Sequence, residues 1–165
     1  KFTGKMTELE NLHITLKFLG ELDTSMLEKV RGRLNNVTFE KFEAKVSEIG
    51  TFVYRGMPRI VWVKIGGKGI FELQKKVDLA LQELFSIEEK FMSHVTVARV
   101  KYVGDAQGFR EYVRNIGLRE VGFRVEKFSL MKSELGRMGP VYTELEGIGA
   151  KEGYCRHSRG ICFSY

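Results

Sequence analysis

The 165-residue chain is predicted to adopt an α+β fold made of two pseudo-symmetric lobes that share one cleft. Two His-x-Thr-x motifs, each inside an apolar and β-branched run, support this prediction, and they begin at His13 and His94. The same order of elements follows each motif: strand, helix, strand, strand. The spacing also repeats, since Ile60 follows His13 by 47 residues and Val141 follows His94 by the same 47. We therefore expect each lobe to bring one motif to a common site.

The first half of the chain begins with the motif strand, predicted over residues 11–18. Ser25 and Glu28 fit a capping box at the start of an amphipathic helix. Residues 35–36, both asparagine, are expected to end that helix. Residues 42–46 alternate between apolar and polar side chains and are predicted to form a strand.

The middle of the chain repeats the pattern on the way to the second motif. Residues 60–65 are a continuous apolar run, typical of a buried strand, and the glycine pair 66–67 ends it. Apolar residues at helical spacing predict the longest helix over residues 70–85. The second motif strand is then expected over residues 91–100.

The last predicted helix begins after Asp105, which can cap it, and runs to Ile116. Residues 121–125 alternate as a strand, and their phase breaks at 127–128, which suggests a bulge. A final strand is expected over residues 140–145.

The two halves are expected to differ at the ends of the chain. Only twelve residues precede His13, so the strand and helix that symmetry would place before it are predicted to be missing. We expect a single bilobal domain over residues 1–150, followed by an atypical tail over residues 151–165. Residues 161–165 have the composition of a strand, and this tail or a neighbouring chain could cover the exposed sheet edge.

Composition excludes some classes of protein. The formal net charge of +6 favours a polyanionic partner, although a solvated basic surface would give the same value. No run approaches the roughly 18 apolar residues of a membrane span, and no secretory signal is visible, so we expect no membrane association. Two cysteines, both within the last eleven residues, do not form a disulfide framework and favour a reducing, cytoplasmic location.

The two motifs suggest acid–base chemistry on a phosphate. Alternation along a strand would place His13 with Thr15 on one face, and His94 with Thr96 on one face. Histidine titrates near neutral pH, so a neutral and a protonated imidazole can act together in cleaving a phosphodiester. The two hydroxyls can donate hydrogen bonds to phosphate oxygens. Such a site requires neither a metal nor a cofactor.

Several segments resemble the 2H phosphoesterase superfamily, and within it the 2′-5′ RNA ligase-like proteins, regarded as RNA 2′,3′-cyclic phosphodiesterases. The motif segments are ENLHITLKFLG at residues 10–20 and SHVTVARV at residues 93–100. Further similar segments are PRIVW at residues 58–62, SEL at residues 133–135 and GPVY at residues 139–142.

The resemblance covers about residues 8–147 and implies a bilobal 2H phosphoesterase fold, with two antiparallel sheets around a central cleft and helices outside. It implies that His13 is the proton donor to the leaving 3′ oxygen and that His94 is the base that activates water. Thr15 and Thr96 match the phosphate-binding hydroxyls. The implied substrate is RNA or a nucleotide with a 2′,3′-cyclic phosphate, and the implied product is a 2′-phosphomonoester.

Other residues are weaker candidates for substrate binding. Arg99 lies three residues after Thr96, so it should point to the opposite face unless the strand bends, with a surface salt bridge as the alternative. Arg59 and Tyr54 could line the rim of the cleft and bind a phosphate and a base, or could be ordinary loop residues. Phe18 is expected in the core rather than as a platform for a base.

Five further features have simpler interpretations. Trp62 is expected in the core, and Ser133 and Tyr142 are expected to pack or to bond backbone groups. The glycine-rich residues 66–69 lack the spacing of a phosphate loop and are predicted to be a strand-to-helix turn. The tail residues Cys155, His157 and Cys162 lack a recognisable zinc spacing.

Two alternatives to cyclic phosphate hydrolysis stay open. The reverse reaction, 2′-5′ ligation of RNA, would use the same groups. A nucleotide- or RNA-binding module without turnover would keep the cleft, and retained binding without product would identify it.

Overall fold

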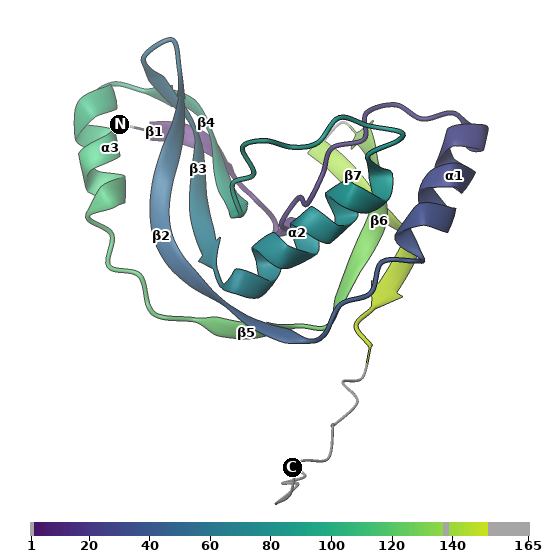
Figure 1. Cartoon of the computed structure of the whole chain (residues 1–165). Coiled ribbons are helices and arrows are strands. Elements are labelled where there is room, and N and C mark those ends of the chain that lie inside the picture. The colour runs from purple at the N-terminus through teal and green to yellow at the C-terminus, as the bar shows by residue number, and fades with distance from the viewer. Residues whose placement is uncertain (1, 137–138, 152–165) are drawn as a thin grey trace, which may run out of the picture.

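A computed structural model describes residues 2–136 and 139–151 and confirms the α+β class, with two antiparallel sheets and three α-helices in this part of the chain (Figure 1). The larger sheet has five strands in spatial order: β1 (Phe2–Met6), β4 (His94–Val103), β3 (Met57–Gly66), β2 (Phe42–Tyr54) and β5 (Gly122–Val125). The smaller sheet pairs β6 (Lys127–Gly136) with β7 (Gly139–Gly149). The helices are α1 (Thr24–Leu34), α2 (Lys68–Leu81) and α3 (Ala106–Arg114), and a short 3₁₀ helix, η1, spans Leu9–Asn11.

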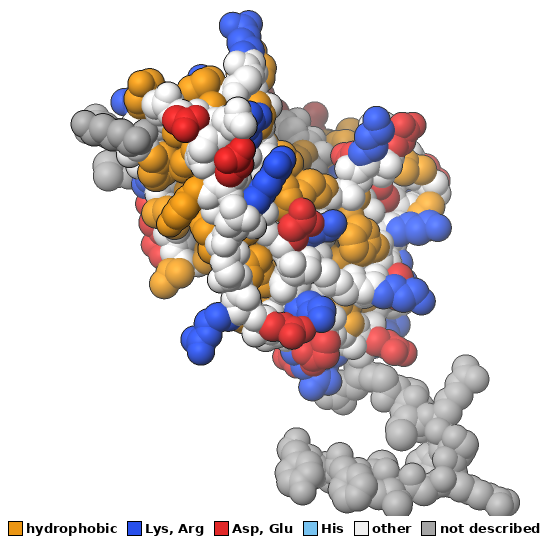
Figure 2. Space-filling model, turned by 90° about the vertical axis from the view of Figure 1, so that its left-hand side faces the viewer, with side chains coloured by type: hydrophobic (Ala, Val, Ile, Leu, Met, Phe, Trp, Pro, Cys, Tyr) orange, Lys and Arg blue, Asp and Glu red, His pale blue; other side chains and the backbone are white. Residues whose placement is uncertain are grey.

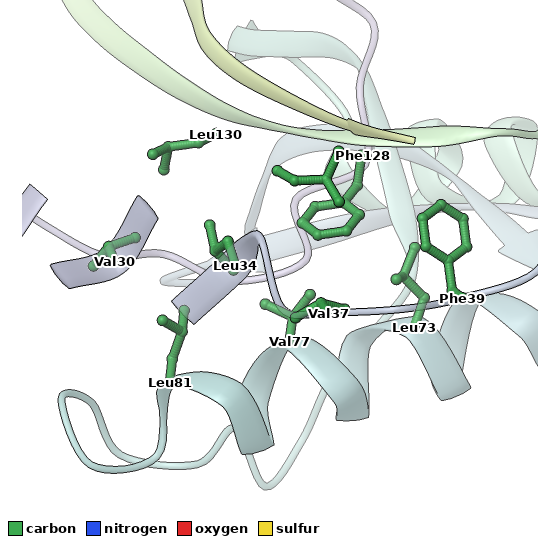
Figure 3. Packing of buried hydrophobic residues seen from close by; sticks show 10 residues of the cluster. Val30, Leu34, Val37, Phe39, Leu73, Val77, Leu81, Phe128 and Leu130 are labelled. Carbon is green, nitrogen blue, oxygen red and sulfur yellow. The ribbon is translucent and has the colours of Figure 1, made fainter. Parts of the chain in front are cut away.

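The smaller sheet forms one lobe with α1 and α2 (Figure 1). Leu73, Val77 and Leu81 follow one face of α2 and pack with Leu34 of α1 and Phe128 of β6 (Figure 3). Each of these five side chains is at least nine-tenths buried. Burying a large apolar side chain stabilises a fold by roughly 1.5–3 kcal/mol, so this cluster joins the helices to the smaller sheet.

The larger sheet forms the second lobe, and α3 covers its outer face (Figure 1). Val113 of α3 packs against Val61 of β3 and against Ala98, Val100 and Val103 of β4. Seen from this side, Lys and Arg side chains are mixed with Asp and Glu (Figure 2). The net positive charge therefore does not form a single basic patch on this face.

The two predicted helix caps have different outcomes. Asp105 caps α3 as predicted, and its side chain accepts hydrogen bonds from the amides of Gln107 at 3.1 Å and Gly108 at 3.0 Å. The capping box at Ser25 is wrong, because the cap of α1 lies two residues earlier. Asp23 is the N-cap, and its carboxylate accepts from the amide of Met26 at 2.8 Å.

The predicted strand over residues 11–18 is also wrong. Only Ile14 makes a β-bridge in this segment, to Val95 of β4. A strand that was not predicted precedes it, because residues 2–6 form β1 along β4, from Phe2 opposite Val103 to Met6 opposite Ala98. β1 and Ile14 thus occupy successive parts of the same edge of β4, which leaves residues 11–18 no continuous ladder.

The phase break at residues 127–128 marks a change of sheet rather than a bulge. β5 ends at Val125 in the larger sheet, and β6 begins at Lys127 in the smaller one. The strand β6 was not predicted, because only Phe128 and Leu130 of its residues are buried and no long apolar alternation marks it. β7 is longer than the predicted strand over residues 140–145.

β2 continues well beyond the predicted residues 42–46, to Tyr54. Gly50 lies within this extension, opposite Trp62 of β3. A Cβ atom at Gly50 would lie only 2.4 Å from the indole of Trp62, so a glycine is required where the ring crosses the strand. Trp62 is 8% exposed, which confirms its predicted place in the core.

The described residues contain no helix long and apolar enough to cross a membrane. Lys151 ends the described part of the chain with a parallel bridge to Glu40. Cys155, His157, Cys162 and the strand-like residues 161–165 lie outside the described residues.

Candidate active site

A cavity of about 260 Å³ lies where the two lobes meet, and both motif histidines line it. Its walls come from β4, from the N-terminal segment before α1 and from the β6–β7 hairpin. The lining residues are Lys5, Met6, Thr7, Glu8, Asn11, His13, Phe18, His94, Thr96, Arg99, Ser133, Gly139, Pro140 and Tyr142. The two motif histidines therefore line one cavity, as expected, together with Thr96 of the second motif.

Each imidazole is held by a hydrogen bond to the carbonyl oxygen two residues before it. Nδ1 of His13 lies 2.7 Å from the carbonyl oxygen of Asn11, and Nδ1 of His94 lies 2.8 Å from that of Met92. A carbonyl oxygen can only accept, so Nδ1 must carry the proton in both rings. Nε2 of each ring is then the atom that can give or take a proton in the cavity.

Each imidazole also packs against an aromatic ring. The His13 ring lies edge-on to Tyr142 of β7, with centroids 4.8 Å apart, and the His94 ring lies edge-on to Phe52 of β2, at 5.1 Å. Tyr142 follows the second motif in the chain but contacts the histidine of the first, and Phe52 follows the first motif but contacts the histidine of the second. No sequence pattern singled out Phe52, while Tyr142 was expected only to pack.

A β-bulge in β4 brings Arg99 to the same cavity as Thr96. Trp62 of β3 pairs with Thr96 and Val61 pairs with Ala98, so Val97 is an extra residue on β4. The extra residue reverses the alternation beyond it, and Arg99 therefore points to the face that carries Thr96. The expectation that Arg99 points away from Thr96 unless the strand bends is thus resolved by this bulge. In the described part of the chain, Arg99 makes no salt bridge.

The structure does not bring three other predicted residues to the cavity. Thr15 is half-buried but does not line it, because the segment around Ile14 lacks the alternation of a strand. Nη1 of Arg59 donates to the carbonyl oxygen of Lys101 at 3.1 Å, on the neighbouring strand. Tyr54 is exposed near the β2–β3 turn, with the Arg55 guanidinium 5.3 Å from its ring centroid.

Phe18 and Ser133 line the cavity, which the sequence did not predict. The expectation that Phe18 belongs to the core is wrong, since its side chain is 87% exposed. Leu16 and Leu19 pack on the core beside it, and in an irregular segment Phe18 need not share a face with Leu16. An exposed aromatic ring that lines a cavity is suited to stacking on a nucleobase.

No group of three His, Cys, Asp or Glu side chains within the described ranges is arranged to hold a metal ion. The cavity instead gathers two imidazoles, several hydroxyls and cationic groups, which can bind a phosphate and move protons at it.

Comparison with known proteins identifies relatives of this chain. A model of LigT-like phosphoesterases matches residues 1–62 and 65–142. The chain is 35% identical over 152 residues to the RNA 2′,3′-cyclic phosphodiesterase of Aeropyrum pernix, covering 88% of this chain and 86% of that protein. It is 36% identical over 144 residues to the protein of the same name from Archaeoglobus fulgidus, covering 86% and 81%.

Solved structures agree on the fold. TT0787 of Thermus thermophilus superposes with a TM-score of 0.72 at 28% identity, over 88% of this chain and 81% of that one. E. coli LigT complexed with 3′-AMP superposes with a TM-score of 0.67 at 22% identity, over 90% and 82%, a likeness of fold alone.

Proposed function

Because this chain belongs to the LigT-like phosphoesterase family, we propose that it is an enzyme that hydrolyses 2′,3′-cyclic phosphate ends of RNA to 2′-phosphomonoesters. The observation that supports this most is the pair of imidazoles on one cavity, each bonded through Nδ1 to a carbonyl. In the proposed reaction, the Nε2 atoms of these two rings would act as the base and the acid that cleavage of a phosphodiester needs.

Because Nδ1 of each ring is bonded to a carbonyl oxygen, we propose that each ring transfers a proton at Nε2. His94 starts neutral, and its Nε2 takes a proton from water as the water oxygen bonds to phosphorus. The bond from phosphorus to the 3′ oxygen breaks, and His13 donates the proton on its Nε2 to that oxygen. His13 must therefore start with protons on both nitrogens, and exchange with solvent restores both rings after each turnover.

Hydrogen-bond donors around the histidines stabilise the charge on the phosphate. Thr96 donates to a non-bridging oxygen, and the Arg99 guanidinium on the same face attracts the phosphate. The proposal gives Thr15 the same task in the first motif, although Thr15 does not line the cavity. A comparison of the two threonines is therefore informative.

The substrate we propose is RNA or a nucleotide, and its terminal base would stack on the exposed ring of Phe18. Arg59 and Tyr54 lie outside the cavity and would contact only a longer RNA. The proposal includes a cytoplasmic location, which rests on the cysteine content and the RNA substrate.

The direct test is incubation with an RNA oligonucleotide that ends in a 2′,3′-cyclic phosphate, with EDTA present. We expect a 2′-phosphate end, formed at the same rate with and without EDTA. Formation of a 3′-phosphate would reverse the assignment of the leaving group, and binding without product would favour a module without turnover. An added 5′-hydroxyl RNA tests ligation, which would appear as a 2′-5′ linked product.

A further inference from the structure

The segment that carries His13 receives little support from backbone pairing. Ile14 makes its one β-bridge, and the described residues place no strand ladder along residues 11–18. Leu16 and Leu19 pack on the core of the smaller lobe, but the hydrophobic effect that favours these contacts is non-directional. A catalytic imidazole at this place needs a directional restraint from elsewhere.

A buried ion pair supplies such a restraint. The Lys17 ammonium, four residues after His13, contacts Asp78 of α2, and the two side chains are only 7% and 3% exposed. Lys17 also donates to the carbonyl oxygen of Ser86 at 2.6 Å. The other oxygen of Asp78 accepts from the side chain of Gln74 at 2.9 Å and from the amide of Glu88 at 2.8 Å.

These bonds satisfy the Asp78 carboxylate and keep it ionised. Burial raises the pKa of Asp78, but hydrogen bonds from Lys17, from the Glu88 amide and from Gln74 outweigh it and hold the pKa below the ordinary value of 3.8. A buried pair of this kind adds little net stability compared with apolar side chains of similar volume. The pair therefore contributes mainly directional bonds rather than net stability.

The pair joins the two motifs through α2. On one side it holds the segment of His13, and on the other it holds Ser86 and Glu88 in the loop that leads into β4. Glu88 precedes Met92 by four residues, and the Met92 carbonyl holds the His94 ring. One carboxylate thus bonds both the segment of His13 and the loop that leads into β4.

We propose that the Lys17–Asp78 pair is a positioning device that sets the placement of His13 relative to His94. The expected effect on catalysis rests on the proposed function. Without the pair, the segment of His13 would shift, while β4 would keep His94, Thr96 and Arg99 in place through its own ladders. Displacing an acid by about 1 Å can slow a reaction by about 100-fold.

The test compares D78N and K17M with the double variant K17M/D78L, which removes both charges together. The control is E120Q, which removes one charge from the exposed Lys45–Glu120 pair on the larger sheet. Each variant is measured for kcat, KM and thermal unfolding, at a temperature where circular dichroism shows it folded. Ring Nδ1–H signals from NMR are assigned to His13 and His94 with H13A and H94A, since the chain has three histidines.

In D78N and K17M we expect kcat to fall about 10- to 100-fold with KM changed less than about threefold. The His13 Nδ1–H signal should shift or broaden, the His94 signal should persist, and E120Q should match the wild type. K17M/D78L should regain thermal stability without regaining kcat.

A double variant with wild-type kcat and an unshifted His13 signal would overturn the proposal and leave the pair a structural role. Should the wild type itself fail to hydrolyse the cyclic phosphate, the proposed function would fall. The His13 signal in D78N would then still decide whether the pair positions this ring.

Discussion

The two histidine rings make the same kinds of contact, but their backbones are supported in different ways. His94 lies on β4, which pairs with β3 on one side and with β1 and Ile14 on the other. His13 lies on an irregular segment with one bridge and a buried ion pair four residues later. Both rings nevertheless donate from Nδ1 to a carbonyl and meet an aromatic edge.

This difference shows that the same ring contacts can be provided by two kinds of backbone support. The orientation of each imidazole depends on one carbonyl and one aromatic ring, and these can be presented by a ladder or by side-chain anchoring. The ladder around His94 consists of backbone bonds that no single substitution removes. The support of His13 depends on a few side chains, so mutations near it should separate stability from activity more clearly.

The largest expected effect is the loss of either imidazole. H13A and H94A should each reduce the rate of cyclic phosphate hydrolysis by about 10²–10⁴-fold, the usual contribution of a general acid or base. The double variant should be hardly slower than either single one, because the two groups act in one step. Single-turnover assays measure these rates.

Thermal unfolding sharpens this comparison. H13A should change the melting temperature little, because His13 is exposed. H94A should lower it more, because His94 is half-buried and packs on Phe52. Full activity in either variant would remove that histidine from the mechanism.

The next effect compares the two threonines. T96A should lower kcat by about 100-fold, because Thr96 lines the cavity and its hydroxyl can donate to the developing charge. T15A should have a smaller effect, since Thr15 lies off the cavity. Serine at each position keeps the hydroxyl and is the matched control. Equal losses in T15A and T96A would mean that substrate binding makes the two motifs equivalent.

A smaller effect is expected for the two arginines. R99A should raise KM by about tenfold, the value of one charge-assisted hydrogen bond. R59A removes a similar charge that bonds the Lys101 carbonyl, and it should leave KM for a short substrate unchanged. If R59A matched R99A, the substrate would extend over the outside of β3 and β4, and the cavity alone would not define the site.

The sequence predicted much of this fold because repetition is visible in it. The helices α1, α2 and α3, the motif strand β4 and the meeting of His13 with His94 all follow from periodicity and spacing. The position of Arg99 could not be predicted, because a bulge at Val97 is decided by pairing with β3. Phe18 and Thr15 were placed by strand alternation, which fails where the edge of β4 is already occupied.

The smallest effect is a pH dependence of stability that comes from the Lys17–Asp78 pair. The pKa of Asp78 is lowered in the folded state by its bonds to Lys17, Glu88 and Gln74, against the effect of burial. The stabilisation of the fold by the ionised Asp78 is therefore complete above the ordinary pKa of 3.8, and it is lost as the pH falls through the lower folded pKa.

Urea unfolding at pH 6 and pH 3 measures this loss. At pH 6 the free energy of unfolding of the wild type should exceed that of D78N by about 3 kcal/mol, and at pH 3 this difference should be smaller. Glu8, Glu120 and Glu144 also have lowered pKa values, but they are present in both proteins and cancel. A constant difference between wild type and D78N at both pH values would contradict this origin of the stability.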